Sequence, residues 1–472
     1  MTERVTSLDP LRVFISAGWA GKLEVKSLQE ACFELCCECR NVMSVDISFC
    51  KQGSKLWIGR GDTAGAKQVN DTSCGRVPPL RVNHVTWELP VKDLLRKRVW
   101  PHGIERWTFG RGFNERLPRR RTLRGRLCSR SGWCFYGVPQ IVWPEGLKVL
   151  TFGWNFNQRV DGVEWPTNLE QLTFGEEFDQ PVIQVEWPAR LKHLTFGTKF
   201  NQPMNGVVLP RCLAKLTLGW LFNQPLNGVV WSEGLKQLTL GGRTGQFNQP
   251  LGGVRWPEGL TQLKFGGCFN QQVDDVLWPK GLQELTFGDR FNQPVDSVVW
   301  PERLEKLTFQ GGFNQPLDRV LWPEGLKSIT LGLGFNQPIV SVVWPDGLQE
   351  LTFQHGFNQP VDLVTWPEGL KQLRFGLSFN HPIVGTTWPE GLEQLTFGAY
   401  FNQRLDHVVW PKGLKQLAFG HGFNQPVDKV FWPVGLERLS FGDGFYQRLD
   451  GIAWPEGLKQ LILGSGRNPL LT

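Results

Sequence analysis

Long hydrophobic stretches are missing from this chain of 472 residues. No apolar run reaches the roughly 18 residues that suggest a membrane-spanning helix, so we expect no such helix. Residues 1–5 also lack the apolar core with which a secretory signal peptide would begin to insert. The 10 cysteines follow no regular spacing, so we do not expect them to form a disulfide framework. These absences predict a protein of a reducing compartment, the cytoplasm or the nucleus.

Catalytic signatures are missing as well. The sequence has no P-loop, no G-x-S-x-G nucleophile elbow, no H-E-x-x-H zinc motif and no dinucleotide fingerprint. Its histidines are scattered and match no metal-ligand spacing: His84, His102, His193, His355, His381, His407 and His421. A catalytic site needs several different groups that converge on one place. The sequence therefore predicts a protein that is not an enzyme and that needs no cofactor.

A cluster of cysteines lies near the amino terminus, at Cys32, Cys36, Cys37 and Cys39. Cys36 and Cys39 have the C-x-x-C spacing that occurs in zinc sites. A structural zinc site needs a second pair at a matching distance, and neither Cys50 nor Cys74 supplies one. We therefore predict that the thiols lie on the apolar face of a short helix and that no metal site forms. Metal binding or redox chemistry is the alternative.

What the sequence does contain is a phrase of 22 residues that repeats through most of the chain. The copy that begins at Trp278 reads WPKGLQELTFGDRFNQPVDSVV. Copies begin at Trp143, Trp165, Trp187, Leu209, Trp231, Trp256, Trp278, Trp300, Trp322, Trp344, Trp366, Trp388, Trp410, Trp432 and Trp454. Successive starts are 22 residues apart, except that Trp231 and Trp256 are 25 apart. Such a fixed period is the signature of a solenoid, in which each coil contacts its neighbours.

The phrase can be numbered from its tryptophan as position 1 to position 22. Around positions 7 to 10, polar and apolar residues alternate, which predicts a short strand with one buried face. Phe at position 14, as in Phe291, predicts a spine of rings, and Asn at position 15, as in Asn292, predicts a ladder that bonds the backbone where each coil bends. Gly at position 4, as in Gly281, is expected to form a left-handed turn. The fold class predicted is a β-rich repeat solenoid with one short strand in each coil.

The pattern L-x-x-L-x-F-G-x-x-F-N resembles a leucine-rich repeat. F-N-Q-P following L-T-F-G resembles more closely the FNIP repeat family, whose repeats are 22-residue relatives of leucine-rich repeats. The resemblance covers residues 143–472, about fifteen coils, with an outlying copy from Trp100 to Leu117. It implies a leucine-rich-repeat-like solenoid and, for some members of the family, an F-box near the amino terminus. Residues 1–80 show no clear F-box.

Three regions follow from these patterns. Residues 1–80 form a small irregular α+β segment without the repeat, residues 81–142 hold degenerate repeats with an arginine-rich insert, and residues 143–472 form the solenoid. The insert contains Arg119, Arg120, Arg121, Arg124 and Arg126. It is interpreted as a degenerate coil or surface loop. A nuclear-localisation or nucleic-acid-binding patch is the first alternative, and an error in the gene model is the second.

The most variable positions of the phrase are 12 and 13, and positions 7 and 9 lie on the exposed face of the expected strand. Curved repeat proteins bind partners through such surfaces, and exposed aromatic residues tend to carry the binding energy. The residues predicted to contact a protein are Trp154, Glu176, Glu177, Lys199, Trp220, Lys264, Arg290, His355, Arg374, Tyr400 and His421. The alternative is a solvated polar face without a partner, whose edge tolerates random substitution.

Asp recurs at position 19, as in Asp296 and Asp318. A column of carboxylates could bind calcium, but the glycine-rich context of calcium-binding β-helices is missing. Capping of a turn is therefore the favoured role.

Together these features predict a non-enzymatic protein–protein interaction scaffold that presents a curved strand face to an unknown protein. Two alternatives stay open. The family resemblance suggests a substrate-receptor subunit of a ubiquitin ligase, which would bind ligase components. The arginine-rich insert suggests nucleic-acid binding, which would be sensitive to salt. We expect no association with a membrane.

Overall fold

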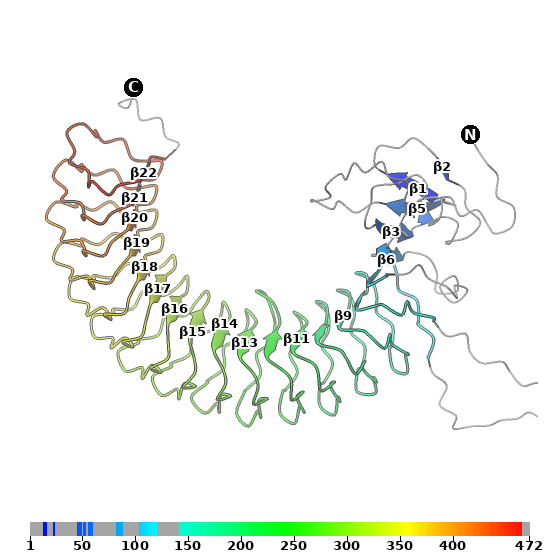
Figure 1. Ribbon diagram of the computed structural model, residues 1–472. Helices are drawn as coiled ribbons and strands as arrows, with labels where there is room; N and C mark the ends of the chain where they lie inside the picture. Colours follow the sequence, from blue (N-terminus) through cyan, green and yellow to red (C-terminus); the bar gives the residue numbers. More distant parts are fainter. Residues whose placement is uncertain are drawn as a thin grey trace, which may run out of the picture. The chain divides into compact units, whose positions relative to one another are not determined.

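The computed structural model describes residues 103–119 and 141–464 and, before them, six β-strands (Figure 1). The strands are β1 (Val13–Ser16), β2 (Lys22–Leu23), β3 (Val45–Phe49), β4 (Lys51–Gln52), β5 (Lys55–Gly59), β6 (Val82–Trp87), β7 (Arg106–Phe109), β8 (Val149–Thr151), β9 (Gln171–Thr173), β10 (His193–Thr195), β11 (Lys215–Leu218), β12 (Gln237–Leu240), β13 (Gln262–Phe265), β14 (Glu284–Phe287), β15 (Lys306–Phe309), β16 (Ser328–Leu331), β17 (Glu350–Phe353), β18 (Gln372–Arg374), β19 (Gln394–Thr396), β20 (Gln416–Ala418), β21 (Arg438–Ser440) and β22 (Gln460–Ile462). Within the described residues, no helix has the length and apolar character needed to span a membrane. The cysteine cluster, with its predicted helix, lies outside the described residues.

The chain divides into two units, residues 1–224 with 229–235, and residues 225–228 with 236–472. The first unit contains a small sheet of order β2-β1-β5-β4, in which β1 and β5 are parallel. It also contains a parallel array that runs from β3 through β6, β7, β8, β9 and β10 to β11. The array thus begins with β3, a strand from the segment that was expected to lack the repeat. In the second unit, β12 to β22 pair in parallel in chain order.

Register follows the sequence period. Leu285 pairs with Leu307, the residue at the same position of the next copy. The copy with three extra residues keeps the alignment, because Leu238 pairs with Leu263. Where the phrase is lost between β7 and β8, Trp107 still pairs with Leu150. Equivalent side chains are therefore stacked directly upon one another, which confirms the predicted β-solenoid.

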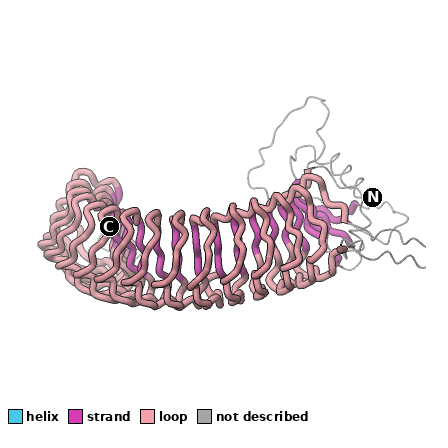
Figure 2. The backbone as a smooth tube through the Cα atoms, turned by 90° about the horizontal axis from the view of Figure 1, so that it is seen from below, coloured by secondary structure: helices cyan, strands magenta, loops and turns pink. Residues whose placement is uncertain are grey.

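Each coil is bent by three turns, which the copy at Trp278 illustrates. The Leu282 N–H donates to Pro279 O at 3.0 Å, Phe291 N–H to Gly288 O at 3.3 Å, and Val298 N–H to Val295 O at 3.4 Å. The turns divide the coil into three short sides, and only the side with positions 7 to 10 forms a strand. Figure 2 shows how small a part of each coil the strand occupies. In each unit, the strands line the inner side of the curve (Figure 1).

The glycine prediction for position 4 holds for Gly103 of the outlying copy, which has a φ of +89°, but is wrong for the copies from Trp143 onward. Gly281 does not have a positive φ; the positive φ values of the repeat fall mostly at position 20, as in Gly206 (φ +75°) and Gly253 (φ +77°). His407 adopts the same left-handed conformation at position 20 with a φ of 70°. At position 4, the absence of a side chain instead permits close packing, since a Cβ on Gly281 would lie 3.2 Å from the carbonyl oxygen of Glu258 in the preceding coil.

The core is built from columns of equivalent apolar side chains, one from each coil. Phe287 and Phe291 of one coil stack with their ring centroids 4.0 Å apart. Phe291 also stacks on Phe313 of the next coil at 6.1 Å, and Phe287 on Phe309 at 5.5 Å. All four rings are fully buried. The predicted spine of position-14 rings is confirmed, and position 10 adds a second, parallel stack of rings.

The predicted asparagine ladder is also confirmed. The backbone N–H of Asn314 donates to Asn292 Oδ1 of the preceding coil at 2.8 Å, and Gln315 Nε2 donates to the same oxygen at 3.1 Å. Asp179 takes the place of one asparagine and still accepts from Asn201 N–H at 2.9 Å. The ladder satisfies backbone donors at the bend after each phenylalanine, where no strand provides a partner.

Candidate protein-interaction surface

The strand face consists of positions 6, 7 and 9 of successive coils. In β14, burial alternates along the strand: Glu284 is exposed, Thr286 is half-buried, and Leu285 and Phe287 are buried between them. The same alternation recurs in β11, β15 and β17. It confirms that positions 7 and 9 share the solvent-facing side, as period-two alternation requires.

Position 6 carries a ladder of ion pairs that sequence analysis did not single out. Lys192 Nζ lies 3.0 Å from Glu170 Oε2 of the preceding coil, and Lys327 Nζ lies 3.2 Å from Glu305 Oε1. Three further pairs follow the same rule, Lys148 with Glu105, Lys415 with Glu393 and Lys459 with Glu437. The signal in the sequence is an alternation of Lys and Glu at one position of the phrase. These pairs neutralise much of the charge on the strand face.

The hydrogen bond from Lys192 lowers the pKa of the Glu170 carboxyl below its ordinary value. The pair lies in solvent, so its contribution to stability is small. Its importance is geometric, because it ties a side chain of one coil to the next.

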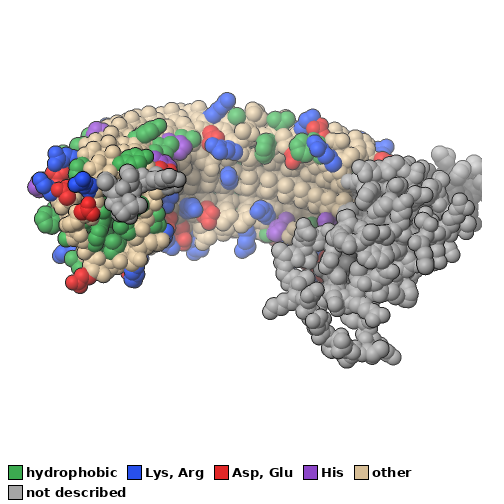
Figure 3. Space-filling model, turned by 90° about the horizontal axis from the view of Figure 1, so that it is seen from above, with side chains coloured by type: hydrophobic (Ala, Val, Ile, Leu, Met, Phe, Trp, Pro, Cys, Tyr) green, Lys and Arg blue, Asp and Glu red, His purple; other side chains and the backbone are tan. Residues whose placement is uncertain are grey.

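A shallow hollow of about 280 Å³ lies on the strand face of the second unit. It is lined by positions 6 and 7 of four consecutive coils, from Gln283 to Glu350. Acidic, basic and amide side chains alternate around it, so it offers mixed polar contacts. Figure 3 likewise shows side chains of all kinds interspersed across the visible surface of the described part.

The rim, formed by positions 12 and 13, borders the strand face. In the first unit it carries Trp154 and Trp220, which are 48% and 49% exposed. The guanidinium carbon of Arg111 lies 5.1 Å from the Trp154 ring centroid, so one face of this indole is covered by a cation. The two tryptophans nevertheless leave large apolar surfaces open to a partner.

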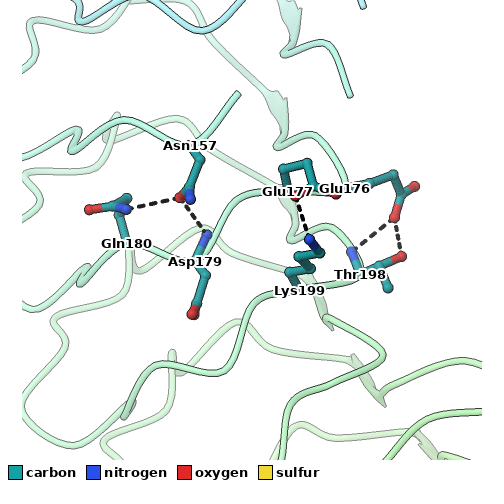
Figure 4. Close-up of polar contacts among 7 residues, drawn as sticks. All are labelled: Asn157, Glu176, Glu177, Asp179, Gln180, Thr198 and Lys199. Atoms are coloured by element: carbon teal, nitrogen blue, oxygen red, sulfur yellow. Dashed lines mark hydrogen bonds and ion pairs between the residues drawn. The ribbon is translucent and has the colours of Figure 1, made fainter. Parts of the chain in front are cut away.

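Between these tryptophans, the predicted contact residues are bonded to neighbouring coils (Figure 4). Glu176 accepts hydrogen bonds from the backbone N–H and the hydroxyl of Thr198. Lys199 Nζ lies 2.6 Å from Glu177 Oε2. These three charged side chains therefore join adjacent coils, and a partner would have to compete with or extend these contacts.

The rim of the second unit differs in composition. Tyr400 is 65% exposed and is its largest outward aromatic side chain. His421 Nδ1 lies 3.2 Å from Asp443 Oδ2, a pair between adjacent coils. Arg290 and His355 are exposed on the rim, and Lys264 and Arg374 are exposed at position 9 of the strand face. The predicted residues therefore lie along both units, and no single cluster unites them.

The three extra residues of the copy at Trp231 enlarge the rim. They fall between β12 and Phe247, where Gly241 has a φ of +83° and Gly245 N–H donates to Gly242 O at 2.8 Å. The side chain of Arg243 projects from this turn, 78% exposed, with its Nε 3.5 Å from Asp289 Oδ2. The insertion is therefore absorbed in a turn at the rim, and the columns of the core continue past it.

The structure gives Arg119 a contact within the array. Its Nη2 lies 2.9 Å from Asp161 Oδ1, and its backbone forms an isolated antiparallel bridge with Val163. Burial lowers the pKa of the Arg119 guanidinium, and the charge of Asp161 opposes that effect. Arg120, Arg121, Arg124 and Arg126 lie outside the described residues. Across the residues that are described, no group of three or more His, Cys, Asp and Glu side chains could hold a metal ion.

Comparison with protein families agrees with the repeat geometry. The FNIP repeat model matches residues 178–221, 276–312, 313–355 and 379–422. These four stretches of the chain are FNIP repeats. The matched copies contain the stacked Phe column and the asparagine ladder. The Phe and Asn of the FNIP motif are therefore the residues that join one coil to the next.

The solved structure of CroV588 places this fold among leucine-rich-repeat folds. The crystal structure of CroV588, described as a novel circular leucine-rich-repeat protein, is 34% identical with a TM-score of 0.64, and the match covers 81% of this chain. It covers 56% of CroV588, so this chain spans little more than half of that protein's length. An internalin, inlF, from Listeria monocytogenes is 12% identical with a TM-score of 0.35, covering 64% of this chain and 82% of its own. TLR13 in complex with ssRNA13 is 12% identical with a TM-score of 0.44, covering 90% of this chain and 62% of its own. A comparison with curated proteins finds no match.

Proposed function

We propose that the FNIP repeats form a non-enzymatic scaffold that binds a protein partner through the strand face and its rim. The observation that carries the proposal is the exposure of Trp154, Trp220 and Tyr400 on the rim. Large aromatic side chains supply much contact area at a low cost in conformational entropy and are enriched among residues that dominate protein interfaces. The ladders behind them hold the backbone in place, so little order has to be gained on binding.

The polar side chains of the strand face support the same role. Ion pairs at position 6 neutralise part of its charge, and exposed cations such as Lys236, Lys371 and Arg438 remain. Polar contacts around aromatic anchors give specificity more than affinity. The two narrower functions predicted from the sequence, ubiquitin-ligase receptor and nucleic-acid binding, gain no support from the described residues. In particular, Arg119 is already paired with Asp161.

The test compares three forms of the full chain as baits in affinity capture with quantitative mass spectrometry. The forms are the native chain, the rim variant Trp154→Ala/Trp220→Ala/Tyr400→Ala, and the control variant Tyr446→Ala. Tyr446 is 52% exposed but occupies position 15, outside the two rim positions. We expect a protein that binds directly to the native chain and the control, with affinity for the rim variant reduced at least about tenfold. Equal capture by all three forms, confirmed with the purified partner, would contradict the proposal.

A further inference from the structure

A second surface stands out at position 22, on the side of the coil that contains neither the strand nor the rim. In four consecutive coils of the second unit, this position holds Leu277, Val299, Leu321 and Val343. Their exposed fractions are 87%, 79%, 83% and 77%. We call these four side chains the apolar stripe. Because coils repeat about every 4.8 Å along the array, the stripe extends on the order of 15 Å.

The exposure is built into the coil. Position 21, as in Val298, and position 1, as in Trp300, point inward and are 5% and 6% exposed. The residue between them must therefore point outward. A solvent-facing position next to buried ones is usually polar, and single exposed apolar residues need no explanation. A continuous row of them on adjacent coils is characteristic of an interaction site.

Acidic residues flank Val299 and Leu321 on both sides in the sequence, and they flank Leu277 and Val343 on one side each. Position 3 holds Glu258, Glu302, Glu324 and Asp346, and positions 19 and 20 hold Asp274, Asp275, Asp296 and Asp318. All eight side chains are exposed. The cations near the stripe are Lys280, Arg303, Arg319 and Arg255, which stands at position 22 of the coil before Leu277. Arg319 Nε lies 3.9 Å from Asp318 Oδ2, which reduces its availability to a partner. The stripe is therefore a narrow apolar row within a predominantly negative border.

We propose that the apolar stripe docks a basic amphipathic polypeptide segment. Apolar side chains of the segment would cover Leu277, Val299, Leu321 and Val343, while its Lys or Arg side chains would face the carboxylates on either side. Charge complementarity selects this occupant. An anionic membrane surface would be repelled by the acidic border, and a second copy of the stripe would bring like charges together. This surface is separate from the rim, so it goes beyond the proposed function.

The chain offers a matched control at the same position of the coil. In the first unit, Val208 and Val230 also stand at position 22 and are 78% and 70% exposed. Their positions 19 and 20 are Asn or Gly, and Arg211 follows Val208 at position 3. The control thus has the apolar exposure with a single carboxylate at these positions, Glu233 after Val230.

The experiment uses the native full chain, the stripe variant Leu277→Ser/Val299→Ser/Leu321→Ser/Val343→Ser and the control variant Val208→Ser/Val230→Ser. Two fluorescent peptides of equal length serve as probes, one alternating Leu with Lys and one alternating Leu with Glu. Binding is measured by fluorescence anisotropy at two salt concentrations, and sedimentation velocity measures the oligomeric state. Circular dichroism checks folding, which substitution of exposed side chains should leave intact.

We expect the Leu/Lys peptide to bind the native chain and the control variant equally, and the stripe variant at least about tenfold more weakly. Added salt should weaken the binding, because the carboxylates are exposed. The Leu/Glu peptide should not bind. Equal binding of the Leu/Lys peptide to all three proteins, or equal binding of both peptides, would overturn the proposal. A dimer of the native chain that is lost in the stripe variant would overturn it in favour of a second copy as the occupant.

Discussion

The core and the rim of each coil differ in how far their residues vary from one copy to the next. Inside, the ring of Phe291 stacks on Phe269 at 6.0 Å and on Phe313 at 6.1 Å, so each side chain meets its own copy on both sides. At the rim, position 12 changes from Trp154 to Glu176 in adjacent coils. The position-14 column holds Phe in every copy from Trp143 to Trp432, whereas a side chain that faces solvent can differ in every coil. The repeat therefore separates the residues that hold the array together from those available for recognition.

Removal of a ring from the core column should give the largest effect. Phe291→Ala leaves a cavity that both neighbouring coils line, and we expect a loss of about 3–5 kcal/mol in the free energy of unfolding. Urea denaturation followed by circular dichroism would measure it. Tyr446→Ala, which removes an exposed ring, should change stability by about 0.5 kcal/mol or less. Similar losses for both variants would remove the distinction between core and surface.

A methyl group at a crowded glycine should have the next largest effect. A Cβ on Gly175 would lie 1.8 Å from the carbonyl oxygen of Gly153 in the preceding coil. Gly175→Ala should therefore force the two backbones apart, at a cost of about 1–3 kcal/mol. Gly112→Ala is the control, since a Cβ there meets no atom within 4 Å. If the two variants denature at the same urea concentration, the close approach at Gly175 does not contribute to the free energy of unfolding.

The asparagine ladder should show a smaller effect that depends on chemistry. Asn292→Ala leaves the N–H of Asn314 and an amide hydrogen of Gln315 without their shared acceptor. We expect a loss of about 1–2 kcal/mol. Asn292→Asp keeps the acceptor oxygen, as Asp179 does, and should retain most of the stability. Thermal unfolding of both variants tests this role. If Asn292 acts through packing and not through its acceptor oxygen, Asp and Ala should lower the melting temperature equally.

The ion pair on the strand face should give the smallest effect. Because the hydrogen bond from Lys192 lowers the pKa of Glu170 in the folded state, the pair stabilises the fold above the ordinary Glu pKa of about 4.3 and ceases to do so as pH falls through the lowered pKa. Glu170→Gln should slightly lower the melting temperature at neutral pH. The difference from the native chain should shrink in acid. A difference that grows on acidification would contradict this role.

Features that arise from contact between copies could be predicted from the sequence. The register of the strands, the spine of rings and the asparagine ladder all follow from one period, because equivalent residues in a solenoid must lie one above another. The ion pairs at position 6 follow the same logic, and alternation of Lys192 and Glu170 with their neighbours would have revealed them.

Two kinds of feature could not be predicted in this way: those that depend on backbone conformation, and contacts between residues that are distant in the sequence and not related by the period. A glycine can be needed either for a positive φ or for close packing of two backbones. The residue type alone does not tell which role applies at Gly281 and which at Gly253. The pairing of Arg119 with Asp161 crosses the region where the period is lost. The repeat pattern likewise placed Trp154 on the rim. That Arg111 covers one face of its ring is a contact between coils that the pattern does not predict.

The asparagine ladder has a consequence for how such a chain can change in length. Each coil offers one acceptor to the next coil and uses one from the coil before it, as Asn292 does between Asn270 and Asn314. A duplicated or deleted coil therefore leaves its neighbours with the same donors and acceptors. Unequal recombination between copies can lengthen or shorten the gene without creating an unpaired backbone group. Each such event moves the rim residues on either side nearer together or further apart, so recognition can diversify by spacing as well as by substitution.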